Sequence, residues 1–190
     1  MQAIDNALLR SMIDAGANSP VLWTIARWLT ELGGWKWLCS LTAVVAVWLA
    51  MRGYLRRAVA FVAITLGVRP VMETLKWWTD RPRPQLVHHP VLVHSQSFPS
   101  GHATDSMTVY LSLALIVTPL LTRARWPVPA AVLLSIAIGL SRPILGVHWP
   151  SDILAAWSLG LAWTLSTVWL LSGWIEGQPG RPGRPLSVRR

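Results

Sequence analysis

Apolar residues dominate five long stretches of this chain, and short polar segments separate them. The stretches occupy residues 35–51, 58–78, 103–122, 126–141 and 151–175. A helix that crosses the hydrocarbon core of a bilayer needs roughly 20 residues, with some allowance at its ends. The pattern therefore predicts an all-α fold in which about five transmembrane helices form a polytopic membrane bundle.

Shorter segments flank these spans. Residues 3–14 and 20–32 each suit an amphipathic helix that lies along the membrane surface, because thirteen residues cannot cross a bilayer. Residues 176–190 are rich in Gly, Pro and Arg, which predicts a disordered basic tail. We therefore expect one integral-membrane domain over residues 1–175, with interfacial helices at 1–34 and the transmembrane bundle at 35–175.

The composition supports a membrane protein. Hydrophobic residues make up 53% of the chain and charged residues 13%, about half the charged share of an average soluble domain. The net charge is +9, but the basic residues are spread among hydrophobic runs, which favours membrane lipids over nucleic acid as partners. The single Cys39 lies in an apolar run and cannot form an internal disulfide.

Basic residues in the short loops predict the orientation. If the five spans alternate, the loop arginines and those of the tail fall on one side, which the positive-inside rule makes cytoplasmic. These arginines are Arg52, Arg56, Arg57, Arg123, Arg125, Arg181, Arg184, Arg189 and Arg190. We expect a protein of the bacterial inner (plasma) membrane whose opposite mouth faces away from the cytoplasm.

Few charged residues lie inside the spans. Arg69 and Glu73 are four residues apart on one predicted helix, so we expect them to pair and to face the bundle interior. Asp105, close to the start of the third span, is more simply a helix-start acid than a partner of His102. The long loop carries His88, His89 and His94, which we interpret as solvated residues, so no metal site is predicted.

Three stretches at the extracytoplasmic mouth, residues 76–84, 99–102 and 141–152, hold most of the reactive side chains. Lys76, Arg83 and Arg142 can surround a phosphate, since guanidinium groups bind its oxygens in pairs and the ammonium acts as a point charge. Snorkelling to the interface is the alternative for Lys76 or Arg83 taken alone, and it is the role that we assign to Arg81.

The other two stretches supply hydroxyl, imidazole and carboxylate groups. Ser100 and Gly101 precede the third span, where a helix N-terminus attracts anions; Ser100 can donate to a phosphate or serve only as an N-cap. His148 lies just before the fifth span and Asp152 in its first turn. Asp152 can fix the tautomer of His148 and leave the other ring nitrogen free to attack phosphorus, although a purely structural helix-start role is the alternative.

Together these residues resemble the three-part signature of the type 2 phosphatidic acid phosphatase (PAP2) superfamily. The first part is Lys76, six residues, then Arg83-Pro84; the second is Pro99-Ser100-Gly101-His102. The third is Ser141-Arg142, five residues, His148, three residues, and Asp152.

The resemblance implies a helical core like that of PAP2 enzymes and haloperoxidases, no cofactor, and a phosphohistidine intermediate. In those family roles His148 attacks phosphorus, Asp152 orients it, and His102 protonates the leaving group. Phosphate binding falls to five residues: Lys76, Arg83, Ser100, Gly101 and Arg142. Such enzymes often have six spans where we count five, which leaves the N-terminal topology open.

The resulting hypothesis is a metal-independent membrane phosphatase that acts on a lipid phosphate or diphosphate. Undecaprenyl diphosphate is favoured slightly over phosphatidylglycerol phosphate, because so compact a chain has few polar groups with which to recognise an elaborate headgroup. Two alternatives remain: a vanadium-dependent haloperoxidase, which bears a similar signature, and a non-enzymatic lipid transporter.

Overall fold

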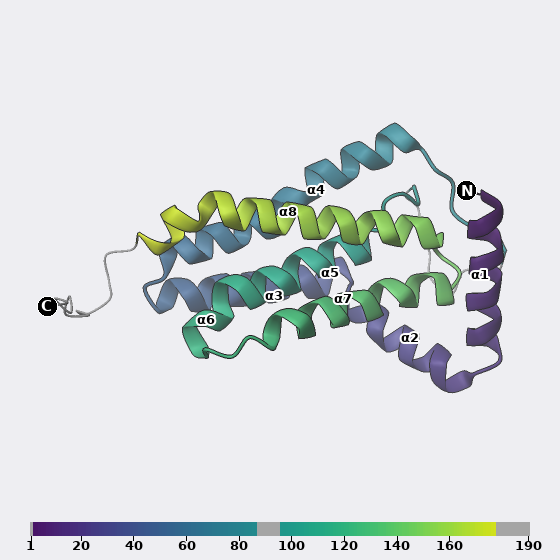
Figure 1. The fold of residues 1–190 in the computed structure, drawn as a ribbon, viewed down its shortest axis with the longest axis horizontal. Helices are drawn as coiled ribbons and strands as arrows, with labels where there is room; N and C mark the ends of the chain where they lie inside the picture. The colour runs from purple at the N-terminus through teal and green to yellow at the C-terminus, as the bar shows by residue number, and fades with distance from the viewer. Residues whose placement is uncertain (1, 87–95, 178–190) are drawn as a thin grey trace, which may run out of the picture.

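The computed structural model describes residues 2–86 and 96–177, which form helices joined by short turns and loops (Figure 1). The elements are α1 (Gln2–Ala17), α2 (Pro20–Leu32), α3 (Trp35–Met51), α4 (Leu55–Thr79), α5 (Gly101–Ser112), the π-helical turn η1 (Leu113–Val117), α6 (Thr118–Leu121), α7 (Pro127–Ile144) and α8 (Pro150–Glu176). The all-α prediction is confirmed. His88, His89, His94 and nearly all of the predicted tail lie outside the described residues.

Four helical segments are long and apolar enough to cross a membrane: α4, the continuous run Gly101–Leu121, α7 and α8. Helices α2 and α3 meet at Gly33-Gly34 with a bend of 47° and together meet the same criteria. The described chain therefore has four spans, or five if the bent pair counts as one. This agrees with the predicted number, although α2 continues into α3 through that bend.

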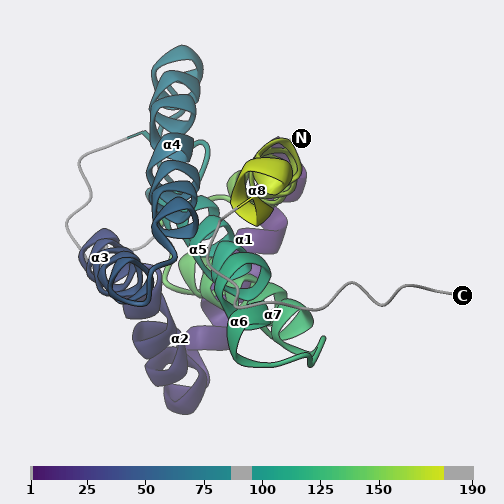
Figure 2. The same ribbon diagram turned by 90° about the vertical axis from the view of Figure 1, so that its left-hand side faces the viewer.

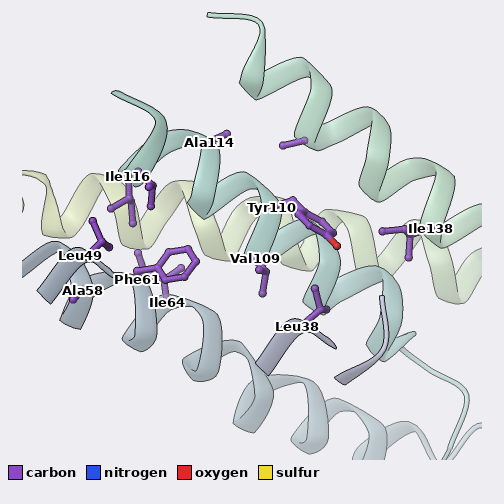
Figure 3. Packing of buried hydrophobic residues seen from close by; sticks show 12 residues of the cluster. Leu38, Leu49, Ala58, Phe61, Ile64, Val109, Tyr110, Ala114, Ile116 and Ile138 are labelled. Carbon is purple, nitrogen blue, oxygen red and sulfur yellow. The ribbon is translucent and has the colours of Figure 1, made fainter. Parts of the chain in front are cut away.

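Helix α5 lies at the centre of the bundle and packs against α3, α4, α7 and α8 (Figure 2). Every residue from Ala103 to Ser112 is buried. Figure 3 shows the apolar core, in which Phe61 and Ile64 of α4 lie near Val109 of α5. Close helix contacts depend on small residues, because a Cβ at Gly160 of α8 would lie 2.9 Å from the Thr104 carbonyl oxygen of α5.

The bundle has two chemically different ends. The turns after α3 and α6, which carry Arg52 and Arg123, lie at one end, and the starts of α5 and α8 lie at the other (Figure 1). Helix α1 crosses this second end, roughly perpendicular to the bundle (Figure 1). The three motif stretches thus meet beneath the N-terminal helix.

The predicted pairing of Arg69 with Glu73 is wrong. Arg69 Nη2 donates instead to Asp105 Oδ2 of α5 at 2.8 Å, while Glu73 is exposed on the outer face of α4. Asp105 lies in the buried centre of the bundle, where an unpaired carboxylate is costly, and this makes it the better partner for a guanidinium that reaches inward.

Candidate active site

The motif stretches are tied together through their backbones. The amide of Ser97 donates to the Arg81 carbonyl at 2.9 Å, which joins the two described parts of the long loop. The amide of Ser100 donates to the Asp152 carbonyl at 3.4 Å, which joins the start of α5 to the start of α8. These contacts bring all three predicted motifs to one mouth of the bundle.

His148 and Asp152 form the pair that the sequence predicts. Nδ1 of His148 lies 3.4 Å from Oδ2 of Asp152, and both side chains are fully or almost fully buried. The same carboxylate oxygen accepts the amide of Trp149 at 3.0 Å, in the first turn of α8. The backbone therefore holds Asp152 in place beneath the imidazole.

The other imidazole nitrogen faces a cation. Arg83 Nη1 lies 2.9 Å from Nε2 of His148 and also donates to the Val147 carbonyl at 2.9 Å. A guanidinium only donates hydrogen bonds, so Nε2 must be the nitrogen that carries the lone pair. This assigns the proton to Nδ1, on the side of Asp152.

The surroundings of His148 favour its neutral form. Burial, followed by the positive charges of Arg142, Arg83 and Lys76, holds the pKa of His148 well below its usual value of 6.5. Both effects act in the same direction, since an imidazolium would be desolvated and would face like charges. A neutral ring with an available lone pair is the state that a nucleophile requires.

Lys76 and Arg142 are buried cations from two different helices. Lys76 is 4% exposed and donates from Nζ to the Gln96 carbonyl at 2.9 Å. Arg142 is 2% exposed and donates from Nη1 to Thr30 Oγ1 at 2.6 Å, while its Nε has no hydrogen-bond partner among the described residues. Neither cation is snorkelling, because both point into the protein.

Ser100 and Gly101 open the N-terminus of α5 toward these cations. Ser100 is the N-cap residue by position, but its side chain makes no capping bond. Its Oγ is buried and has no hydrogen-bond partner within residues 2–86 and 96–177. A Cβ at Gly101 would meet only Met72 at ordinary contact distance, so no crowding by protein atoms requires a glycine there. The unpaired hydroxyl of Ser100 and the space beside Gly101 both suit a ligand that approaches the start of α5 from outside the bundle.

His102 lies one residue further along α5, within range of the same charges. Arg142, His148, Arg83 and Lys76 all act electrostatically on its ring. Below it, Gly33 at the α2–α3 bend packs so closely that a Cβ would lie 3.3 Å from both Cβ and Cδ2 of His102. The bend thus supports the second histidine from behind.

One assignment made from the sequence is wrong. Arg81 does not snorkel: its Nη1 donates to Asp152 Oδ1 at 2.6 Å and its Nη2 to Asp5 Oδ2 at 2.7 Å. Three further residues at the site were missed, namely Asp5, Thr30 and Ser97. Ser97 is fully buried beside His148 and Asp152, and it donates from Oγ to the Pro82 carbonyl at 3.2 Å.

The missed contacts leave little trace in the sequence. The contact from Asp5 spans 76 positions to Arg81, and that from Thr30 spans 112 positions to Arg142. The only local indication is that Asp5 is an acidic residue on the buried side of the amphipathic helix α1. Most of the groups around the mouth are cationic or neutral donors, and such a set suits an anion such as phosphate.

Comparisons with known proteins support the family resemblance. Residues 53–176 match the model of the PAP2 superfamily, which confirms the resemblance drawn from the motifs. Phosphatidylglycerophosphatase B of Bacillus subtilis (strain 168) is 28% identical over 85% of this chain and 80% of its own length. The putative undecaprenyl-diphosphatase YbjG of Escherichia coli (strain K12) is 30% identical, over 88% of this chain and 84% of its own.

A solved structure confirms the fold. The crystal structure of a transmembrane PAP2-type phosphatidylglycerolphosphate phosphatase from Bacillus subtilis superposes with a TM-score of 0.79 at 25% identity. The match covers 95% of this chain and 89% of that protein, so it includes the N-terminal helices as well as the bundle.

Proposed function

The chain belongs to the PAP2 superfamily of membrane lipid phosphatases, and from this premise we propose that it hydrolyses a lipid phosphate or diphosphate through a phosphohistidine at His148. One observation carries the proposal. His148 Nδ1 faces Asp152 and its Nε2 faces the half-buried Arg83, while the buried Lys76 and Arg142 also act on the ring, which is the arrangement that a nucleophile for an anionic phosphoryl group needs.

In the first step, the lone pair on His148 Nε2 forms a bond to phosphorus. The bond between phosphorus and the leaving oxygen breaks, and His102 donates a proton to that oxygen. Arg83 must release Nε2 as the phosphoryl group arrives, and it can then donate to the phosphate oxygens instead. Asp152 stabilises the positive charge that develops on the imidazole.

In the second step, water attacks phosphorus while His102, now neutral, accepts a proton from it. The P–N bond breaks, its electron pair returns to Nε2, and inorganic phosphate leaves. Throughout both steps Lys76, Arg83, Arg142, Ser100 and the amides at the start of α5 offset the charge on the phosphoryl oxygens. Fixed donors of this kind typically supply ~10²–10³ in rate each.

The substrate that we favour is an isoprenoid diphosphate such as undecaprenyl diphosphate, slightly ahead of phosphatidylglycerol phosphate. The relatives support this range, since one is a putative undecaprenyl-diphosphatase and another a phosphatidylglycerophosphatase. A lipid anchored in the bilayer presents its headgroup at the mouth, and the exposed Trp77 and Trp78 at the end of α4 suit the depth of the membrane interface. Because both relatives are phosphatases, they favour this function over a haloperoxidase or a transporter.

Phosphate release by the purified protein in detergent tests the function. We expect kcat/KM for undecaprenyl diphosphate or phosphatidylglycerol phosphate to exceed that for a soluble phosphomonoester by at least about tenfold, as binding energy from the tail is used in catalysis. Turnover should persist in EDTA and be inhibited by vanadate, which resembles the transferring phosphoryl group. Equal turnover of the soluble ester, or loss of activity on chelation that Mg²⁺ restores, would contradict the proposal.

We also propose that the mouth faces away from the cytoplasm. Arg52, Arg56, Arg57, Arg123 and Arg125 lie at the other end of the bundle, where the positive-inside rule places the cytoplasm (Figure 1). In a variant with Cys39 replaced, a cysteine introduced at Gln96 should react with a membrane-impermeant maleimide in intact cells. Labelling that requires permeabilised cells would reverse the orientation.

A further inference from the structure

Helix α1 contributes one buried acidic residue to the site end of the bundle. Asp5 is 3% exposed, although most of its neighbours on the helix are exposed. Its Oδ1 accepts the amide of Ser151 at 3.0 Å, and its Oδ2 accepts Ser151 Oγ at 2.6 Å and Arg81 Nη2 at 2.7 Å. Both carboxylate oxygens are therefore directed at residues that adjoin the catalytic pair.

The contact with Ser151 bears on how α8 begins. Ser151 is the second residue of α8, and its amide is one of those that a helix leaves without an intrahelical acceptor. Asp5 accepts this amide from a different helix, and its negative charge lies at the positive end of the α8 dipole. Asp152 is the next residue, so this contact fixes the turn from which the catalytic carboxylate projects.

Arg81 links Asp5 to Asp152 directly. Its Nη2 donates to Asp5, while its Nη1 donates to Asp152 Oδ1 at 2.6 Å and to Ser151 Oγ at 2.8 Å. The guanidinium also lies over the Trp149 ring, 5.5 Å from its centroid. One cation is thus shared between two carboxylates, and it is held in a fixed plane between them.

This sharing matters for the charge on Asp152. If Arg81 faced Asp152 alone, the two would form a closed ion pair and little negative charge would remain to stabilise a positively charged His148. With Asp5 present, the group Asp5–Arg81–Asp152 carries a net charge of one minus. Although burial raises the pKa of Asp5, the bonds from Ser151 and Arg81 outweigh it, so the pKa lies below the usual 3.8 and Asp5 is ionised at neutral pH.

We propose that Asp5 is a positioning residue of the active site, which acts through Arg81 and Ser151 to hold Asp152 beneath His148 and to keep it negatively charged toward the imidazole. The proposal rests on the proposed phosphatase function. It gives α1 a role in catalysis beyond lying on the membrane surface, and it makes the first turn of the chain part of the site.

The test is the variant Asp5→Asn, which keeps the size of the side chain and an acceptor for the Ser151 amide but removes the charge opposite Arg81. We expect kcat to fall about tenfold per folded molecule, in the range typical of residues that orient a catalytic group, while KM changes less than about twofold. Asp5→Glu should recover part of kcat, because it restores the charge. Asp14→Asn is the matched control: it removes the same charge from an exposed position on the same helix and should leave kcat unchanged.

A double-mutant cycle separates positioning from simple anchoring of α1. If Asp5 acts through Arg81, Asp5→Asn should have little further effect on kcat in an Arg81→Gln background. The proposal is overturned if Asp5→Asn lowers only the thermal unfolding temperature and leaves kcat per folded molecule intact. It is also overturned if the effects of Asp5→Asn and Arg81→Gln on kcat multiply in the double variant. Turnover by the wild-type protein tests the phosphatase function itself, so an active wild type with an unaltered Asp5→Asn variant rejects only the role of Asp5.

Discussion

The two sides of the active-site mouth differ in how completely their polar groups are paired. On the side of α8, both oxygens of Asp152 have partners, since Oδ1 accepts Arg81 and Oδ2 lies against His148 and the Trp149 amide. On the side of α5 and α7, Ser100 Oγ and Arg142 Nε are buried without any hydrogen-bond partner in the described part of the chain. We call the first side complete, because both oxygens of Asp152 are paired. We call the second side open, because Ser100 and Arg142 each keep an unpaired donor.

The difference separates two tasks. A group that must hold a nucleophile in one orientation gains from full pairing, because each hydrogen bond removes an alternative rotamer or tautomer. A group that binds a passing anion must keep its donors available, and a buried unpaired donor costs about 1–3 kcal/mol until a ligand accepts it. Under the proposed mechanism, the complete side would position His148 and the open side would receive the phosphoryl group.

The largest effect should come from the nucleophile itself. His148→Ala removes the proposed nucleophile, so we expect kcat to fall by about 10⁴ or more. Insertion and the thermal unfolding of the variant, followed by tryptophan fluorescence, should remain close to those of the wild type. Retention of more than a small percentage of activity in purified protein would reject the assignment of His148.

The open side can be tested with two serines of α5. Ser100→Ala should lower kcat/KM by about 10²- to 10³-fold and weaken inhibition by vanadate, because one donor to the phosphoryl oxygens is lost. Ser112 is the matched control, since its Oγ is also buried and without a partner in the described residues but lies at the far end of the same helix. Ser112→Ala should leave kcat/KM unchanged; equal effects from both variants would mean that Ser100 matters only for packing.

The pH dependence tests whether the cations of the open side act on the nucleophile. A histidine with the usual pKa of about 6.5 would lose about fourfold in its neutral fraction between pH 7.5 and pH 6. Because burial and the charges of Arg142, Arg83 and Lys76 lower the pKa of His148, its neutral form should persist over this interval. After correction for ionisation of the substrate, and in a His102→Asn background that removes the titration of the proposed general acid, kcat/KM should then fall less than about twofold. A fourfold loss would indicate an unshifted histidine.

The smallest effect on activity is expected at the Arg69–Asp105 ion pair, which lies deeper in the bundle than the mouth. Asp105 is three residues after His102, yet the structure pairs it with Arg69 of α4 at 2.8 Å. Asp105→Asn should therefore lower the free energy of unfolding by about 1 kcal/mol, typical of polar contacts between membrane helices, and change kcat less than about threefold. A loss of kcat similar to that of Ser100→Ala would instead connect Asp105 to His102.

Much of the fold could be predicted from the chain alone. Long apolar stretches predict spans because the backbone can satisfy its hydrogen bonds in lipid only as a helix or a closed barrel. The site residues could be located for a related reason, since each motif lies at the end of a span, and the ends that share one side of the membrane must share one mouth. The positions of Lys76, Ser100, His148 and Asp152 follow from this rule.

The pairing of charges could not be predicted in the same way. Arg69 and Glu73 have the spacing of a helical pair, but Asp105 of a neighbouring helix takes the guanidinium. Arg81 has the sequence context of an interface residue, but it bridges two carboxylates. Residue spacing predicts only ion pairs within one helix. A buried charged group is most stable beside the partner that best replaces its lost hydration, and that partner can lie far away in the sequence.

The helical membrane architecture, the family and the stretches that meet at the mouth can be predicted from the sequence alone, because these depend on periodicity, length and local motifs. Which groups are paired and which are open became visible in the folded structure, as did the contacts of Asp5 with Arg81 and of Thr30 with Arg142. The physical reason is that these contacts depend on the way α1 and α2 fold back across the mouth, and no periodic pattern in a chain encodes the distance between helices that are far apart in sequence.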